Sequence, residues 1–294
     1  MGRDSWDQHW SDYAASAQAN PAQRFRRLLI RKFLHAFSQP GQRRIVDLGS
    51  GQGDLARELR SEFPQAELLG VELSTIGIDV ARQKTPSAVF RQQDLLRPVP
   101  ATEPYRGWAT CAVCAEVLEH VDDPVLFLRN AAAYMDCGCT LVVTVPGGPM
   151  SEFDRHIGHR KHYSTADLRG VLEAAGFSIQ TTEAAGFPFF NLYRMTVILR
   201  GKALIADVSR NPSIFAKVAG TALMGLFRVL FAANSLGGKR GWQTVAVATW
   251  LPDGKHLAPV EPGARPELIQ AEISGRLSSV RQSAESRLMS GPTI

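Results

Sequence analysis

A glycine-rich turn between an apolar run and a helical segment constrains the fold of this chain most. The apolar run at 45–48 contains one acid, Asp47, and leads into Gly49, Gly51 and Gly53 at alternate positions. Because glycine lacks a Cβ atom, such a turn lets the backbone approach a ligand closely at the start of a helix. The pattern predicts a strand, a turn that binds a nucleotide-like cofactor and a helix, the opening unit of an α/β fold.

Two further acids follow the next two apolar runs. Glu72 ends the run at 67–72, where an acid can accept hydrogen bonds from ribose hydroxyls. Asp94 follows the run at 88–91, where a carboxylate can accept a hydrogen bond from an adenine amino group. The acids therefore predict one cofactor site at one edge of a sheet.

Apolar runs and helical patterns alternate from residue 43 onward, which predicts a mostly parallel sheet with helices on both faces. We expect a Rossmann-like, seven-stranded sheet with an antiparallel last strand and a sixth strand parallel to the others. The expected strands are 44–48, 67–72, 88–91, 108–115, 140–145, 178–184 and 242–249, and the expected helices are 53–62, 75–84, 124–135 and 165–175.

Four segments are expected around this sheet. Aromatic residues at helical spacing predict a helical N-terminal cap over 1–40, with a helix start at Asn20. The core would comprise 41–186 and 241–250, and the apolar insertion 187–240 would form a helical lid. Residues 251–294 are typical of a linker followed by a helix or a tail, and homo-oligomerisation through this helix is one alternative.

Charge and composition restrict the partners. The formal charge of +5 is spread along the chain without a lysine-rich block, so no nucleic-acid partner is expected. The first ten residues are polar, which favours a cytoplasmic location over secretion. The insertion is apolar and basic, but Lys217 and Arg228 would each cost about 3 kcal/mol at mid-membrane. Peripheral contact with a membrane surface therefore stays open, whereas a membrane span does not.

Cys111 and Cys114 have the spacing of a zinc-binding C-x-x-C pair, but they lie in an expected strand. Residues three apart in a strand point to opposite faces, so the two thiols cannot hold one ion together. We expect these residues, with Cys137 and Cys139, to be small buried hydrophobic residues in a reduced compartment.

Two more motifs narrow the choice of cofactor. The segment EVLEHVDDP at 116–124 follows the fourth strand, and AAGF at 174–177 ends the helix before the last two strands. With the glycine turn, Glu72 and Asp94, they resemble class I S-adenosylmethionine-dependent methyltransferases, especially the small-molecule branch that includes ubiquinone-type O-methyltransferases. The resemblance covers approximately residues 40–185 and the final strand.

The resemblance implies S-adenosyl-L-methionine as the cofactor and S-adenosyl-L-homocysteine as the product. It places the glycine turn at the methionine portion and the later acids at the ribose and the adenine. The implied cofactor-binding residues are Asp47, Gly49, Ser50, Gly51, Gly53, Glu72, Leu73, Asp94, Leu95, Ala115 and Glu116.

A histidine-rich loop at 154–163 follows the fifth strand, at the edge where open α/β sheets bind ligands. Histidine titrates near neutral pH and can remove a proton from an acceptor. The loop is similar to a G-H-x-R-x-Y signature of the same branch. Arg160 is a candidate substrate contact, with structural anchoring of the loop as the alternative for Arg160 and His159. The candidate catalytic residues are His120, His156, His159 and Tyr163.

Aromatic side chains of the insertion and the N-terminal segment are candidate walls of an acceptor pocket, and packing within the core of the lid is their alternative role. Their character favours a hydrophobic or aromatic acceptor (a natural product, quinone-like or lipid-like precursor) methylated on an O or C atom. The candidates are Tyr13, Phe187, Phe189, Phe190 and Tyr193.

The resemblance also implies an alternative metal site. Glu116, Glu119 and His120 could bind a divalent cation that lowers the pKa of an acceptor hydroxyl. We expect no metal, with Glu119 capping the following helix and His120 packing under the loop.

Two other functions share part of this pattern. A nicotinamide-dependent oxidoreductase uses a similar turn, but it would leave Asp94 and Glu116 unexplained and no second catalytic domain follows. A scaffold that binds the cofactor without catalysis would leave the histidine-rich loop unexplained.

Overall fold

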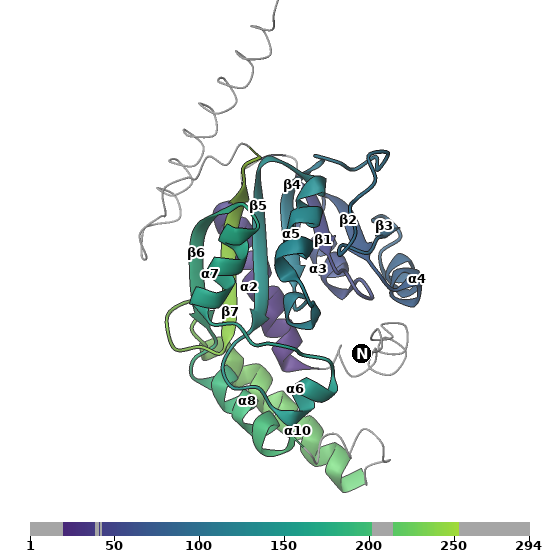
Figure 1. Ribbon diagram of the computed structural model, residues 1–294. Helices are drawn as coiled ribbons and strands as arrows, with labels where there is room; N and C mark the ends of the chain where they lie inside the picture. Colours follow the sequence, from purple (N-terminus) through teal and green to yellow (C-terminus); the bar gives the residue numbers. More distant parts are fainter. Residues whose placement is uncertain (1–19, 39–40, 42, 202–213, 253–294) are drawn as a thin grey trace, which may run out of the picture.

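A computed structural model describes residues 20–38, 41, 43–201 and 214–252, without the side chains of 214–221. Seven strands form one sheet in the order β3-β2-β1-β4-β5-β7-β6 (Figure 1). They are β1 (Arg44–Leu48), β2 (Glu67–Glu72), β3 (Val89–Gln92), β4 (Ala109–Ala115), β5 (Met135–Pro146), β6 (Phe177–Ala185) and β7 (Gln243–Trp250). Because β7 alone runs antiparallel to its neighbours β5 and β6, the expected Rossmann-like, mostly parallel sheet is confirmed.

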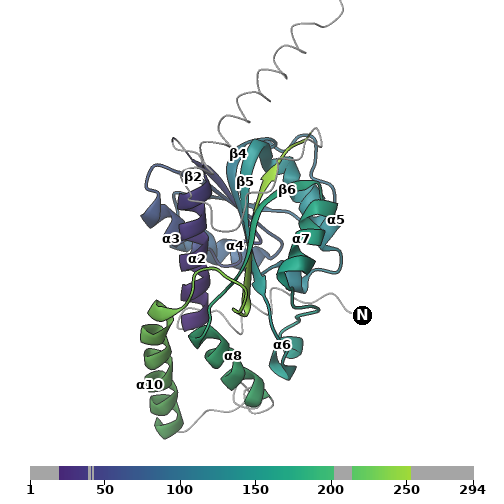
Figure 2. The ribbon, with the colours of Figure 1, turned by 90° about the vertical axis from the view of Figure 1, so that its left-hand side faces the viewer.

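Helices cover both faces of the sheet (Figure 2). One face carries α2 (Pro21–Phe37), α3 (Asp54–Glu62) and α4 (Thr75–Lys84), and the other carries α5 (Pro124–Ala131) and α7 (Thr165–Ala174). At one end of the sheet lie α6 (Glu152–His156), α8 (Phe189–Leu199) and α10 (Ile214–Leu230) (Figure 1). None of the helices in the described part of the chain is long and apolar enough to cross a membrane.

The two faces of the sheet have separate hydrophobic cores. Cys111 packs with Ile45 and Val142 on the face covered by α2 and α3. Cys114 packs with Leu141 on the face covered by α5 and α7. The prediction that these two thiols point to opposite faces is therefore confirmed.

The helix α2 joins the sheet to the insertion. Its C-terminal half packs into the sheet core through Ile30 and Leu34. Its N-terminal half packs through Phe25 and Leu29 against aromatic residues of α8 and α10. The described part of the expected N-terminal cap thus lies along the sheet, whereas 1–19 and the expected tail at 253–294 lie outside the described residues.

The largest difference in boundaries lies between the helix expected over 124–135 and the strand expected over 140–145, which is Met135–Pro146. The helix expected over 124–135 ends at Ala131, a 3₁₀ turn follows at Ala132–Tyr134, and β5 begins at Met135. The local sequence AAAYM favours a helix because alanine has the highest helix propensity. Burial of Tyr134 and Met135 against the sheet overrides this local preference.

Candidate active site

The glycine turn after β1 has a backbone that only glycine adopts readily. The φ angles are +74° at Gly49, +52° at Gly51 and +76° at Gly53. A Cβ atom on Gly49 would lie 2.6 Å from a methyl group of Val117, and one on Gly53 would lie 2.7 Å from Cβ of Ala81. Conformation therefore disfavours a side chain at all three glycines, and packing also excludes one at Gly49 and Gly53.

Glu72 organises the same turn from the end of β2. Its Oε2 accepts a hydrogen bond from the backbone N–H of Gly51 at 2.8 Å, and Oε1 accepts one from Ser74 at 2.9 Å. The side chain is buried. Because each carboxylate oxygen has a second lone pair, Glu72 can hold the turn and still accept hydrogen bonds from ribose hydroxyls.

Two buried polar atoms, one at the end of β1 and one in the turn, have no partner among the described residues. Asp47 is buried, and its Oδ2 has no hydrogen-bond partner among the described residues. Burial, and then the nearby charge of Glu72, raises the pKa of Asp47 to about 7. The hydroxyl of Ser50 is likewise buried without a partner in the described chain. Buried polar atoms of this kind are usually satisfied by a ligand or water.

The residues expected at the adenine lie on the loops after β2 and β3. Leu73 is 45% exposed directly after β2, which leaves its side chain available for packing. Asp94 accepts a hydrogen bond from the backbone N–H of Leu96 at 3.0 Å. Leu95 is buried in the sheet core, so only its backbone can face a ligand.

Glu116 follows β4 and half-buried Ala115 with a φ of +56°, which is uncommon for a residue with a side chain. Its Oε2 lies 2.9 Å from Nε of Arg26 on α2, and its Oε1 accepts a hydrogen bond from Gln243 on β7 at 2.8 Å. The Glu116 carboxylate therefore ties the end of β4 to α2 and β7. Arg26 and Gln243 were not among the site residues predicted from the sequence.

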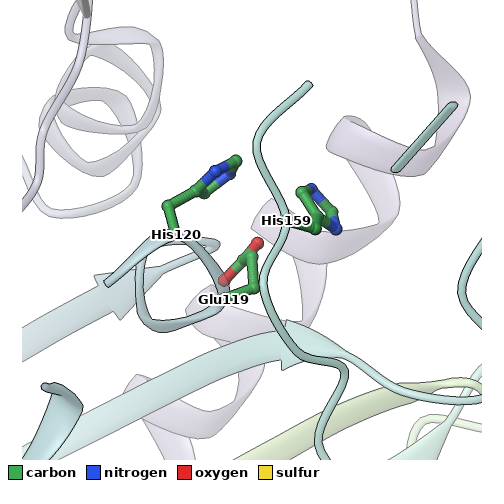
Figure 3. A group of neighbouring side chains, drawn as sticks. All are labelled: Glu119, His120 and His159. Atoms are coloured by element: carbon green, nitrogen blue, oxygen red, sulfur yellow. The ribbon is translucent and has the colours of Figure 1, made fainter. Parts of the chain in front are cut away.

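Glu119, His120 and His159 come together from the loops after β4 and β5 (Figure 3). One ligand atom of each lies within 4.8 Å of the other two. Glu119 is 1% exposed, and neither of its carboxylate oxygens has a hydrogen-bond partner within the described residues. Burial, and then the charge of Glu116, raises the pKa of Glu119 well above its usual range, which favours its protonated form.

This group differs from the alternative metal site of the sequence analysis. The carboxylate of Glu116 is held by Arg26 and Gln243, and His159 stands in its place beside Glu119 and His120. A carboxylate and two imidazoles at this spacing could hold a small divalent cation.

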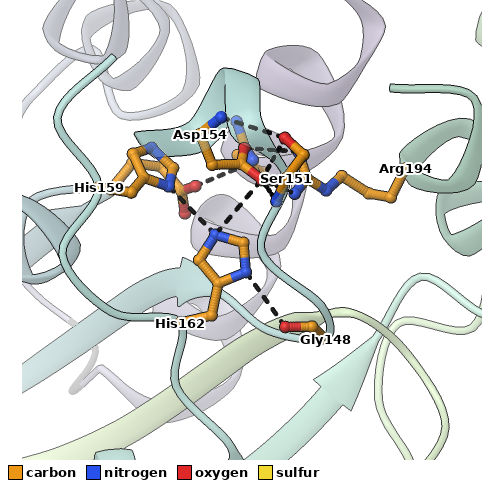
Figure 4. Close-up of polar contacts among 8 residues, drawn as sticks. Gly148, Ser151, Asp154, His159, His162 and Arg194 are labelled. Carbon is orange, nitrogen blue, oxygen red and sulfur yellow. Dashed lines mark hydrogen bonds and ion pairs between the residues drawn. The ribbon is translucent and has the colours of Figure 1, made fainter. Parts of the chain in front are cut away.

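A second set of contacts connects the histidine loop to the insertion (Figure 4). Nδ1 of His159 lies 3.1 Å from Nε2 of His162. Asp154, in α6, accepts hydrogen bonds from both terminal nitrogens of Arg194 at 3.0 and 2.6 Å, and Asp154 and Ser151 form a capping box. Arg194 lies on α8, so this buried ion pair attaches the insertion to the loop that carries the histidines.

Arg160 anchors the histidine loop. Its side chain donates a hydrogen bond to the carbonyl of His120 and pairs with Asp122 at 3.0 Å. Its backbone N–H donates to the carbonyl of Glu119 at 2.7 Å. These contacts favour the alternative role, in which Arg160 holds the loop in place.

Two candidate catalytic residues lie outside the group formed by Glu119, His120 and His159. Tyr163 is buried in the sheet core, and its hydroxyl donates a hydrogen bond to the carbonyl of Leu118 at 3.0 Å. Burial raises the pKa of Tyr163 to about 12. His156 is exposed at the end of α6, and neither group of potential metal ligands includes it. These contacts of Tyr163 favour packing over the expected catalytic role.

The expected pocket walls divide into two pairs. Phe190 and Tyr193 are buried against Phe25, so their placement differs from the expectation and matches the alternative of lid packing. Phe187 is 41% exposed and Phe189 is half-buried, which leaves these two as candidate walls. Tyr13 lies outside the described residues.

The comparison with known families decides the assignment. Residues 22–182 match the model of a methyltransferase domain family. The chain belongs to this family. The resemblance of its motifs to class I S-adenosylmethionine-dependent methyltransferases is thereby confirmed.

Named relatives match this methyltransferase over parts of their length. Trans-aconitate 2-methyltransferase from Acidovorax sp. (strain JS42) is 36% identical over 73 residues, which cover 25% of this chain and 28% of that protein. Malonyl-[acyl-carrier protein] O-methyltransferase from Halalkalibacterium halodurans is 34% identical over 154 residues, which cover 50% of this chain and 54% of that protein. This methyltransferase therefore spans from about a quarter to about half of the length of these relatives.

The fold is also that of solved methyltransferases. The structure of phosphoethanolamine N-methyltransferase 2 from Haemonchus contortus, in complex with S-adenosyl-L-methionine, superposes with a TM-score of 0.53 at 15% identity. The superposition covers 85% of this chain and 61% of that chain. At this level of identity the comparison supports the fold.

Proposed function

We propose that this methyltransferase transfers a methyl group from S-adenosyl-L-methionine to an oxygen or carbon atom of a hydrophobic small molecule. The observation that carries the proposal is the packing of the glycine turn against Val117, in the loop after β4 that also carries Glu119 and His120. Val117, which a Cβ atom on Gly49 would strike, immediately precedes the 3₁₀ turn Leu118–His120. The cofactor turn and the titratable side chains of Glu119 and His120 are therefore neighbours at one edge of the sheet.

The residues of the turn suit this cofactor. Glu72 offers oxygens to the ribose hydroxyls, Asp47 and Ser50 offer buried atoms that lack partners in the described structure, and Asp94 faces the adenine in the proposed arrangement. When bound, S-adenosyl-L-methionine supplies a methyl group on a positively charged sulfur, and attack by the acceptor leaves a neutral thioether. What the chain must add is orientation of the acceptor and a site for the proton that the acceptor loses.

The acceptor is proposed to be hydrophobic because Phe187 is 41% exposed and Phe189 is half-buried at the start of α8, the helix that Arg194 ties to the histidine loop. Oxygen is favoured as the methylated atom by the name of the malonyl-[acyl-carrier protein] O-methyltransferase relative, although that match covers only half of either chain. A carbon acceptor remains the second candidate, since it also loses a proton in the reaction.

Replacement of His159 by alanine is expected to lower kcat by about 100-fold or more, because a positioned general base contributes that much. Activity is measured as S-adenosylhomocysteine formed with a panel of phenols, catechols, quinols and fatty acids, with and without EDTA. The affinity for S-adenosylhomocysteine should stay unchanged, and His35→Ala, on the exposed surface of α2, serves as the matched control.

Full activity of the His159→Ala variant would exclude this role. We expect EDTA to leave the rate of the wild-type protein unchanged. A rate lost with EDTA and restored by Mg²⁺ would instead assign a metal to Glu119, His120 and His159.

We propose in addition that α8 and α10 contact an anionic membrane surface. Apolar side chains on the two adjoining helices are exposed: Leu192 by 52%, Leu199 by 79%, Leu226 by 54% and Val229 by 73%. Residues 187–241 contain eight basic residues and one acid. Exposed apolar surface combined with positive charge is typical of helices that lie in a lipid interface, and the charge specifies anionic headgroups.

Sedimentation with vesicles tests this contact. We expect the protein to sediment with vesicles that contain phosphatidylglycerol and to stay in solution with phosphatidylcholine alone. The double variant Leu199→Glu/Val229→Glu should lose the interaction, whereas Leu126→Glu, at an exposed position on α5, should keep it. Dimerisation abolished by the same double variant, without vesicle binding, would assign the surface to a second copy of the chain and overturn the proposal.

A further inference from the structure

Two histidines of the histidine loop and a backbone carbonyl form a chain of hydrogen bonds (Figure 4). The carbonyl oxygen of Gly148 lies 3.1 Å from Nδ1 of His162, and Nε2 of His162 lies 3.1 Å from Nδ1 of His159. A carbonyl oxygen only accepts hydrogen bonds, so Nδ1 of His162 must carry a proton. In a neutral ring, Nε2 of His162 then accepts, and the proton between the two rings belongs to Nδ1 of His159.

Both imidazoles are neutral in this arrangement. Burial, and then the neighbouring His120, lowers the pKa of His159, and burial also lowers the pKa of His162. The acid that faces His162 is Asp154, whose Oδ2 lies 3.8 Å from Nε2. Its charge is matched by the bidentate contact with Arg194, so Asp154 does not need a protonated His162 as a counter-ion.

We propose that His162, oriented by the carbonyl of Gly148, is a positioning residue that fixes His159 in the tautomer protonated on Nδ1. Nε2 of His159 is then the nitrogen that keeps an unshared electron pair. The neutral histidine side chain in water prefers the opposite tautomer, with its proton on Nε2. The contact with His162 thus stabilises in His159 the tautomer that is less populated in water.

The position of His159 beside His120 and Glu119 would allow this lone pair to accept a proton from a bound acceptor. The ring packs edge-on against His120, with 4.7 Å between the ring centroids, and belongs to the group that contains Glu119. Resting on the proposed function, Nε2 of His159 accepts the proton that the acceptor loses as its bond to the methyl group forms. Among the oxygen and carbon acceptors proposed above, this favours molecules with such a proton, namely a hydroxyl or an activated C–H group, over an ionised carboxylate.

Nitrogen-15 NMR of histidine-labelled protein measures the tautomer directly. We expect His159 to be protonated on Nδ1 in the wild-type protein. The variant His162→Gln keeps one acceptor and one donor at a similar separation and should retain this tautomer, whereas His162→Leu should shift the proton of His159 to Nε2. With an acceptor found in the panel, kcat should fall by about 10–100-fold in His162→Leu and recover in His162→Gln, without a change in the affinity for S-adenosylhomocysteine.

A wild-type His159 protonated on Nε2 would overturn the proposal, even if His162→Leu fails to fold. So would a tautomer or a kcat that is the same in His162→Leu and the wild-type protein. If the tautomers are as expected and no methyl transfer is found with any acceptor, the positioning contact stands and the proposed function fails.

Discussion

Replacement of Glu72 by alanine is expected to weaken binding of S-adenosylhomocysteine by about 100-fold or more, because hydrogen bonds to a charged group contribute about 1.5–3 kcal/mol each. The variant loses the contacts of the carboxylate with the backbone N–H groups of Gly51 and Ser74. It also loses the oxygens proposed to bind the ribose. A single substitution therefore removes hydrogen bonds to the turn and hydrogen bonds to the ligand.

Isothermal titration calorimetry measures this effect, with thermal unfolding as the check that the variant is folded. Glu72→Gln keeps one oxygen acceptor without the charge, so its affinity should lie between those of the wild type and Glu72→Ala. Glu67→Ala, at the exposed start of the same strand, is the matched control and should bind normally. A Glu72→Ala variant that binds like the wild type would remove Glu72 from the cofactor site.

The second large effect concerns the ion pair that attaches the insertion to the histidine loop. Replacement of Arg194 by methionine is expected to lower the free energy of unfolding by about 3–5 kcal/mol, because it leaves the charge of Asp154 buried without its opposite charge. The double variant Asp154→Asn/Arg194→Met should recover most of this loss, since it buries no unpaired charge.

Urea unfolding at neutral pH measures these differences. The matched control is Arg82→Met, which removes an exposed ion pair with Asp79 and should cost less than about 1 kcal/mol. An Arg194→Met variant as stable as the control would show that the pair does not hold the insertion to the loop.

The same ion pair makes stability depend on pH. Burial alone would raise the pKa of Asp154, but the hydrogen bonds and the charge of Arg194 outweigh it and hold the pKa well below its ordinary value. Because the folded pKa is lower than the unfolded one, the contribution is complete above about pH 4 and is lost as the pH falls further. Below pH 4 the double variant should therefore lose less stability than the wild-type protein does.

Local patterns made the cofactor side of the site predictable. The turn at Gly49, Gly51 and Gly53 and the acid Glu72 stand at the ends of consecutive strands, and the order of strands brings their positions together. The sheet itself could be predicted because its strands are short apolar runs separated by helical patterns. The prediction that a helix extends to residue 135 was wrong, because an alanine-rich sequence does not show where burial begins to favour a strand.

The acceptor side depends on contacts that no local pattern contains. Asp154 and Arg194 are 40 positions apart, and Glu116 and Gln243 are 127 positions apart. Two signals were present: the S-x-x-D capping box at 151–154, and a single arginine in the apolar segment 189–199. Neither signal indicates which residue is the partner. The sequence also does not show which aromatic side chains are buried, so Phe190 and Tyr193 could not be distinguished from pocket walls.

The central claim is that the glycine turn and Glu72 hold S-adenosylmethionine. Isothermal titration of the wild-type protein with S-adenosylhomocysteine, and separately with NADH, tests it most directly. We predict saturable binding of S-adenosylhomocysteine that Glu72→Ala weakens by about 100-fold or more, and no binding of NADH. Binding of NADH without binding of S-adenosylhomocysteine would contradict the claim and assign the turn to a nicotinamide cofactor.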